Sequence, residues 1–594
     1  MSPPQRYSFV NARPQTKAEK RQTRTAIRSH IGRWTQENQQ KIEGTKSAAG
    51  ASASASASER SSPELSRTDS LSPAESAQSR SQRRPSRVKV AKAGDTDSSS
   101  STSNVDQDST SDDVDDDTGL TVTAPSHLHQ GLSPAAAGPS RRPYVQVLGS
   151  AVLDPFQTYP STFPSTLISQ CHEYSLQVVW PGLTPRPLSG SESAAIKGWF
   201  PMALNDPVAL HSLLFGALSH KRLNLLGGAV SPDDPAVTHL ERDMRRCEAE
   251  TITLINKALR DPNNAITDAV IVSVLAMATN AWDLTLQRFQ TQPATQPVFD
   301  PLLKSLQWLD VYGLLSAHPV HAAGLVQLVA LRGGLKNIET TGLAAIISYS
   351  GVIQASRTLT QPVFPFVPLT DDGDRTATLW GMLGMRPSEL RDEFTYSSLF
   401  DLGLTTDLAV VWVAMQRYEH GVEMFVDGAL PDLDLARLCD RRNLIQHTLL
   451  SLPSHIDLPS AARSQPIYEP TRLAILIYSL TVIFPIPAQT APITILTRQL
   501  KTALRESDMR SSWSSSHQAQ RLLMWILVIG GVAARDVPEE RLWFIAALGR
   551  LSAQLGIKRF EDLKKTVLKR ILWLDRACDD AGKRLWAEIL ELGG

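Results

Sequence analysis

The chain has 594 residues, and its 60 Lys and Arg balance 60 Asp and Glu, so the formal net charge is zero. This balance excludes a uniformly basic nucleic-acid coat and a strongly acidic surface. Residues 1–140 contain only 15 Leu, Ile, Val and Phe, about 11 %, too few to offset the entropy lost on folding. Eleven of the 12 Trp lie beyond residue 140. We therefore expect a long disordered N-terminal tail followed by a large folded body.

Changes in composition divide the chain into three predicted parts. Residues 1–45 are a basic N-terminal motif that we expect to be partly helical. Residues 46–143 are a disordered linker rich in Ser, Pro and Asp. Within this linker, residues 95–117 hold nine Asp and no Lys or Arg, which we interpret as a solvating spacer. Residues 144–594 form the helical body.

The basic motif has nine Lys and Arg against three Glu, a local excess of six positive charges. Spacings of three and four residues predict a short amphipathic helix with a narrow apolar face. Its candidate contacts with a protein partner or the DNA backbone are Arg24, Arg28, His30 and Arg33. A DNA contact of this kind would chiefly neutralise phosphates and depend steeply on salt. The alternative is a solvated, charge-rich arm without a fixed partner.

A second basic cluster lies in the linker and contains no interleaved acidic residue. Its candidate nuclear-import residues are Arg83, Arg84, Arg87 and Lys89. An import receptor reads such a short run by charge pairing along an extended chain. The alternative is a chance cluster, which is common in linkers rich in Ser and Arg.

The body shows helical periodicity and lacks the alternation of strands and helices of an α/β fold, which predicts an all-α domain. The clearest seam runs through Val237, Leu240, Met244, Cys247, Thr251, Leu254 and Ala258. Pro262 should end this helix, because proline lacks an N–H and clashes with the preceding turn. Similar stripes follow Pro207 and run over residues 563–585. Further helices are predicted at 433–452, 471–484, 493–505, 518–534 and 539–555.

The sequence contains few local motifs that point to chemistry. The four cysteines, Cys171, Cys247, Cys439 and Cys578, are too far apart for a zinc knuckle, and we expect no disulfides, metal or cofactor. His318 and His321 could share a helix face, but Pro319 between them favours a helix start. Gly333 and Gly334 are better explained by a helix C-terminus than by a phosphate loop. Trp543, Trp573 and Trp586 are predicted to pack in the core. No stretch is long enough to span a membrane.

Short blocks spread through the body carry a family resemblance. The most specific block covers residues 318–335 and includes His321, Arg332 and the glycine pair that follows it. Other blocks lie at 154–160, 206–220, 268–277, 523–525, 543–544, 572–575 and 584–586. Together they resemble the fungal-specific transcription factor domain over roughly residues 145–592. The resemblance implies a helical regulatory fold and a nuclear function linked to transcription.

The N-terminus carries a second resemblance. Residues 9–11 (Phe, Val, Asn), followed by residues 28–31 (Arg, Ser, His, Ile), are similar to the opening motif of relatives that lack a zinc binuclear cluster. Four scattered cysteines cannot supply the six thiolates of such a cluster. DNA reading by a zinc cluster is therefore not implied.

These observations predict a fungal nuclear protein resembling transcription regulators, without a zinc cluster, that acts through protein partners. Contact with the DNA backbone through the basic motif stays open. The alternative function is a helical interaction scaffold that never meets DNA. A third hypothesis is an enzyme whose residues converge only in three dimensions, which the absence of local motifs disfavours.

Overall fold

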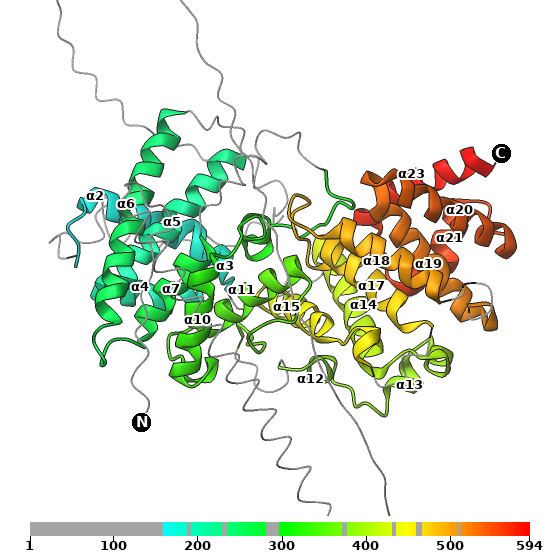
Figure 1. The fold of residues 1–594 in the computed structure, drawn as a ribbon, viewed down its shortest axis with the longest axis horizontal. Helices are drawn as coiled ribbons and strands as arrows, with labels where there is room; N and C mark the ends of the chain where they lie inside the picture. Colours follow the sequence, from blue (N-terminus) through cyan, green and yellow to red (C-terminus); the bar gives the residue numbers. More distant parts are fainter. Residues whose placement is uncertain are drawn as a thin grey trace, which may run out of the picture. The chain divides into compact units, whose positions relative to one another are not determined.

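A computed structural model describes residues 159–186, 192–227, 234–280, 296–370, 377–429, 435–458, 466–507, 509 and 513–593. These residues all belong to one compact unit. They form helices joined by turns, with no strand among them, which confirms the predicted all-α fold for this part of the chain (Figure 1). The predicted tail and its candidate residues lie outside the described residues.

The first helices pack closely around α5. Their bounds are α2 (Ser165–Tyr174), the π-helical turn η3 (Ser175–Val179), α3 (Trp180–Leu183), α4 (Ala194–Asn205), α5 (Pro207–Gly227), α6 (Pro235–Ala258) and α7 (Asp268–Thr279). Helix α5 begins at a proline, and the carboxylate of Asp206 accepts the N–H groups of Val208 and Ala209. It contacts α2, α4, α6 and α7 along its length. The predicted seam of α6 is confirmed, with its first five members buried.

The middle of the chain contains shorter helices and tight turns. The bounds are η4 (Leu306–Trp308), α9 (Leu309–Tyr312), α10 (Pro319–Arg332), α11 (Leu343–Thr358), α12 (Leu379–Leu383) and α13 (Leu390–Glu393). His318 caps α10 by accepting the N–H of His321 at 3.4 Å, and Gly333 ends the helix with φ 91°. Gly334 also has positive φ, so the predicted helix start and the predicted glycine C-terminus are both confirmed.

The C-terminal helices surround an apolar core. They are α14 (Thr406–Val426), α15 (Leu435–Ser451), α17 (Tyr468–Tyr478), η9 (Ser479–Ile483), α18 (Ile493–Glu506), α19 (His517–Ala533), α20 (Pro538–Leu555), α21 (Phe560–Leu563), η12 (Lys564–Leu568), α22 (Lys569–Ile571) and α23 (Asp575–Gly593). The five helices predicted between residues 433 and 555 are present with small shifts of their bounds. Trp573 and Trp586 are buried and Trp543 is partly buried, as predicted.

The stripe predicted over residues 563–585 is buried, but no single helix carries it. The backbone is extended at Leu572, with φ −153° and ψ 116°, so the helix breaks between α22 and α23. Side chains from other helices donate hydrogen bonds to the backbone carbonyls that the break leaves without helical partners. Trp412 Nε1 donates to the Ile571 carbonyl at 3.1 Å, and Trp525 Nε1 donates to the Leu572 carbonyl at 2.8 Å. Tertiary contacts therefore compensate for the hydrogen bonds that the break removes.

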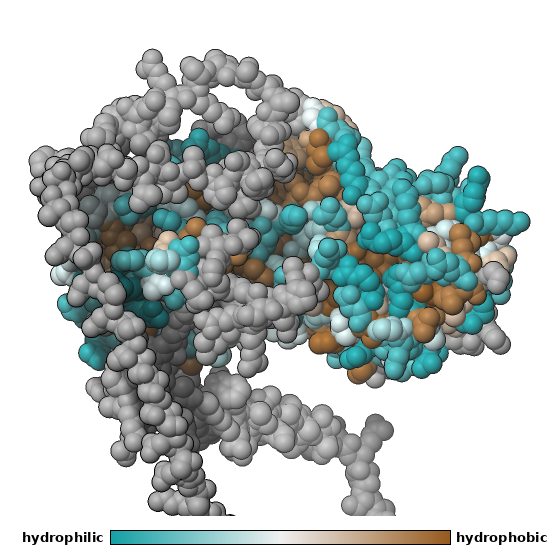
Figure 2. All heavy atoms as spheres, turned by 90° about the horizontal axis from the view of Figure 1, so that it is seen from above, coloured by the Kyte–Doolittle hydropathy of each residue, from teal (hydrophilic) through white to brown (hydrophobic). Residues whose placement is uncertain are grey.

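Hydrophilic side chains cover much of the described surface seen in Figure 2, with hydrophobic residues in smaller groups between them. In the part of the chain that the structure describes, no helix is long and apolar enough to cross a membrane. All four cysteines are buried in the described residues, and none forms a disulfide there. Burial raises the pKa of the Cys171 thiol to about 12, so this group stays protonated.

Candidate functional site

The candidate residues chosen from the sequence cannot be placed in a site. Arg24, Arg28, His30 and Arg33 lie outside the described residues, as do the import candidates Arg83, Arg84, Arg87 and Lys89. Their predicted roles stay predictions. Among the described residues, no group of three or more His, Cys, Asp or Glu could hold a metal ion.

The described part of the chain contains a cavity lined by residues of α3, α4, α5, α7 and α11 and by Tyr312 of α9. The centre of a water-sized sphere can move through about 70 Å³ of it. A single water needs roughly 10–15 Å³ on this measure, so the cavity has room for several waters or for one small molecule. We define this space as the α5–α7 cavity.

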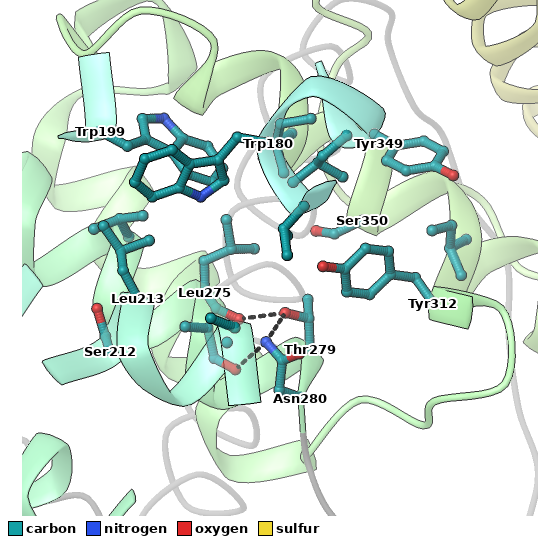
Figure 3. Close-up of a pocket in the computed structure, with 18 of the residues that line it drawn as sticks. Trp180, Trp199, Ser212, Leu213, Leu275, Thr279, Asn280, Tyr312, Tyr349 and Ser350 are labelled. Atoms are coloured by element: carbon teal, nitrogen blue, oxygen red, sulfur yellow. Dashed lines mark hydrogen bonds between the residues drawn. The ribbon is translucent and has the colours of Figure 1, made fainter. Parts of the chain in front are cut away.

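Figure 3 shows how aromatic side chains frame the α5–α7 cavity. Trp180 and Trp199 lie on one side with their rings nearly perpendicular and their centroids 6.5 Å apart. Tyr312 and Tyr349 lie on another side. The Tyr349 hydroxyl points away from the cavity and donates to the Gln307 carbonyl at 3.2 Å, whereas the Tyr312 hydroxyl points into it. The walls therefore combine flat apolar surfaces with few polar groups.

Asn280, at the C-terminal end of α7, is the most informative polar residue of the cavity. Its Nδ2 donates to the Ala276 carbonyl at 3.0 Å and to Thr279 Oγ1 at 3.3 Å. Only an amide nitrogen can donate to the carbonyl, which fixes the orientation of the side chain. The other atom, Oδ1, is buried and has no hydrogen-bond partner among the described residues. A buried acceptor without a partner costs free energy, so this position calls for an explanation.

A cluster of polar and aromatic residues contacts Tyr312 through His220, whose ring centroid lies 6.1 Å from that of Tyr312. Tyr174 Oη lies 2.9 Å from His220 Nδ1 and accepts a hydrogen bond from Asn224 Nδ2 at 3.1 Å. The His220 ring meets the Trp308 ring edge-on, with centroids 4.6 Å apart. Burial lowers the pKa of His220 to about 4, so the imidazole is neutral at physiological pH. The side chains of this cluster are uncharged and pack against one another.

Ser161 and His211 form a pair that bears on the enzyme hypothesis. Ser161 Oγ lies 3.0 Å from His211 Nε2, and His211 Nδ1 lies 2.7 Å from the Pro207 carbonyl. A Ser and His at this distance could act as nucleophile and base. However, a backbone carbonyl instead of a carboxylate orients the ring, and Ser161 Oγ already accepts the N–H of Phe163. The Ser161–His211 contact joins the segment before α2 to α5.

A second buried polar cluster joins α15 to the turn at η4. Arg442 is fully buried and donates to the Leu306 carbonyl at 2.9 Å and to Gln307 Oε1 at 3.0 Å. Its guanidinium also lies 5.1 Å from the centroid of the Phe484 ring. The turn that it holds is unusual, because Gln307 and Trp308 both have positive φ. The cluster therefore stabilises a strained backbone.

Sequence reasoning did not find the α5–α7 cavity, because its walls come from helices far apart in the chain. One local signal exists. Gly216 lies inside α5 and lines the cavity. A Cβ atom built there would meet only Asn280 Nδ2, at 3.9 Å. The glycine inside this helix is therefore a local sign of the cavity in the sequence.

The C-terminal helices are similar to a known protein family. Residues 432–593 match the family model of the fungal specific transcription factor domain. This confirms the predicted resemblance for the C-terminal part of the range over which it was expected. No curated protein and no solved structure matches the chain significantly. The matched residues run from α15 to α23, whereas the α5–α7 cavity lies in residues 179–354.

Proposed function

We propose that this protein is a fungal nuclear regulator of transcription that lacks a zinc cluster and acts through protein partners. The observation that carries the proposal is the match of residues 432–593 to the fungal specific transcription factor domain. The matched helices share a core with the rest of the described body: α15 packs against α11 and α14. The proposal therefore extends the regulatory role to the whole helical body.

The proposed role requires no chemistry of the body itself. The buried ionisable groups are held by packing contacts: His172 lies between the rings of Tyr159 and Phe200, and burial lowers its pKa to about 4. Burial likewise raises the pKa of Glu419 to about 8, and this carboxyl group accepts a hydrogen bond from Tyr478. Such groups stabilise or strain a core without needing a substrate. We propose no catalytic activity.

Contacts with partners are assigned to two regions. The basic motif of residues 1–45 supplies Arg24, Arg28, His30 and Arg33 for a protein or for DNA phosphates. The helical body supplies surfaces between amphipathic helices, a geometry that suits the helix of another protein. Entry into the nucleus is assigned to the cluster around Arg84.

The proposal predicts nuclear localisation of the tagged full-length protein in fungal cells. Changing Arg83, Arg84 and Arg87 together to Ala should shift most of the protein to the cytoplasm, because the import receptor loses its charge pairs. A matched variant with Ser79, Ser81 and Ser86 changed to Ala should stay nuclear, since it alters the same segment without altering its charge. Fluorescence microscopy of the three proteins makes the measurement. A wild-type protein confined to the cytoplasm would overturn the proposed function.

A further inference from the structure

We propose that the α5–α7 cavity is a binding site for a small, uncharged, largely apolar molecule that donates one hydrogen bond. The site lies outside the residues that match the family model, so the inference goes beyond the proposed function and does not rest on it. Failure of one therefore leaves the other standing.

Because the described lining residues are uncharged, we expect the ligand to be uncharged. Aliphatic and aromatic side chains line the cavity with a few neutral polar groups, and no Asp, Glu, Lys, Arg or His is among the described residues that line it. Burying an ionised molecule without a countercharge is costly in such surroundings. Burial also keeps the Tyr312 phenol neutral, because it raises the pKa of this group further above its usual range. An anion or a cation would therefore bind poorly.

The unpartnered oxygen of Asn280 determines the hydrogen-bonding character of the ligand. Asn280 is only 6 % exposed, and its Nδ2 is engaged by its own helix. Its Oδ1 has no partner among the described residues, so it is ready to accept a hydrogen bond from an occupant of the cavity. An N–H or O–H group on the ligand would satisfy it. A ligand with such a group should bind more tightly than the same molecule without it.

The aromatic walls and the size of the cavity determine which ligand shapes fit it. Figure 3 shows the rings of Trp180 and Tyr312 facing a common space bounded below by Leu275. Flat apolar molecules pack well against such ring faces and edges. About 70 Å³ of free movement for a water-sized sphere corresponds to several waters, which one substituted six-membered ring replaces. Cavities with apolar walls favour such molecules over water.

Gly216 lines the cavity, and a larger residue there would fill the cavity without removing any of its side chains. It lies inside α5, and its Cβ position is open apart from a 3.9 Å approach to Asn280 Nδ2. A leucine at this position would project into the empty space. Gly421 in α14 provides the matched control, because it is also a helical glycine and a Cβ there has nothing within 4 Å.

The test is isothermal titration calorimetry of the full-length protein with three probes that share a methyl-substituted benzene ring: p-cresol, toluene and p-toluate. We expect p-cresol to bind at one site per chain, toluene to bind more weakly, and p-toluate not to bind. Gly216→Leu should weaken p-cresol at least tenfold, whereas Gly421→Leu should match the wild type. Asn280→Leu should weaken p-cresol about tenfold, the loss of one buried hydrogen bond, and change toluene less than twofold.

Three results would each overturn the proposal. They are a lack of saturable p-cresol binding, equal binding of p-toluate and p-cresol, and unchanged p-cresol binding by folded Gly216→Leu. Circular dichroism reports whether each variant is folded. If Gly216→Leu does not fold, Asn280→Leu decides the question, since a similar loss for p-cresol and toluene, or none for either, would contradict the assigned hydrogen bond.

Discussion

Replacing Arg442 with Met should lower the free energy of unfolding by about 3 kcal/mol. Arg442 lies in the interior and hydrogen-bonds to the Leu306 carbonyl and to Gln307 Oε1. Methionine keeps much of the volume but donates no hydrogen bond, so the Leu306 carbonyl loses its guanidinium donor. The same substitution releases the left-handed residues Gln307 and Trp308, which the guanidinium helps to hold. Urea denaturation followed by circular dichroism gives the change directly.

Arg441→Met is the matched control, because the neighbouring Arg441 is exposed. We expect it to change the free energy of unfolding by less than about 0.5 kcal/mol. The desolvation of a buried charge can cost more free energy than its hydrogen bonds contribute, so the substitution could also leave stability unchanged or raise it. An Arg442→Met protein as stable as the wild type, or more stable, would show that desolvation of the guanidinium outweighs its hydrogen bonds.

Tyr478→Phe should lower the free energy of unfolding by about 2–4 kcal/mol. The Tyr478 hydroxyl donates to Glu419 and accepts the N–H of Leu574 at 3.0 Å, so it joins α17 to α14 and to the break before α23. Burial raises the pKa of Glu419 to about 8, and this group is therefore mostly protonated at pH 7. Phenylalanine would leave the Leu574 N–H and the Glu419 oxygen without this partner inside the core. Denaturation at pH 7 measures the loss.

Tyr418→Phe separates the lost hydrogen bonds from the general effect of removing a phenol. Tyr418 is also buried, but its hydroxyl has no hydrogen-bond partner among the described residues. Its removal should leave stability unchanged or raise it slightly. Equal destabilisation by the two substitutions would contradict the role assigned to Tyr478.

The sequence predicted those parts of the fold that local physics controls. The seam of α6 appears because its apolar residues recur at helical spacing. The start of α10 at Pro319 and its end at Gly333 follow from the conformations that proline and glycine favour. Each of these features depends on residues close together in the chain.

The break at Leu572 and the α5–α7 cavity depend on residues far apart in the chain, so periodicity could not reveal them. The apolar residues of the stripe over 563–585 recur at helical spacing and are buried on both sides of the break. Their spacing alone therefore predicts one continuous helix. The hydrogen-bond donors at the break come from Trp412 and Trp525, which lie 159 and 47 positions before the carbonyls that they bind. Likewise, Asn280 gains its significance only where α5, α7 and α11 meet.

Recruiting the protein to a promoter tests the proposed role in transcription. The full-length chain would be fused to an unrelated DNA-binding domain in a fungal host, and transcripts of a reporter gene would be measured. We expect the fusion to change reporter transcription severalfold, up or down, relative to the DNA-binding domain alone. Reporter levels equal to those of the DNA-binding domain alone, with the fusion present in the nucleus, would contradict it.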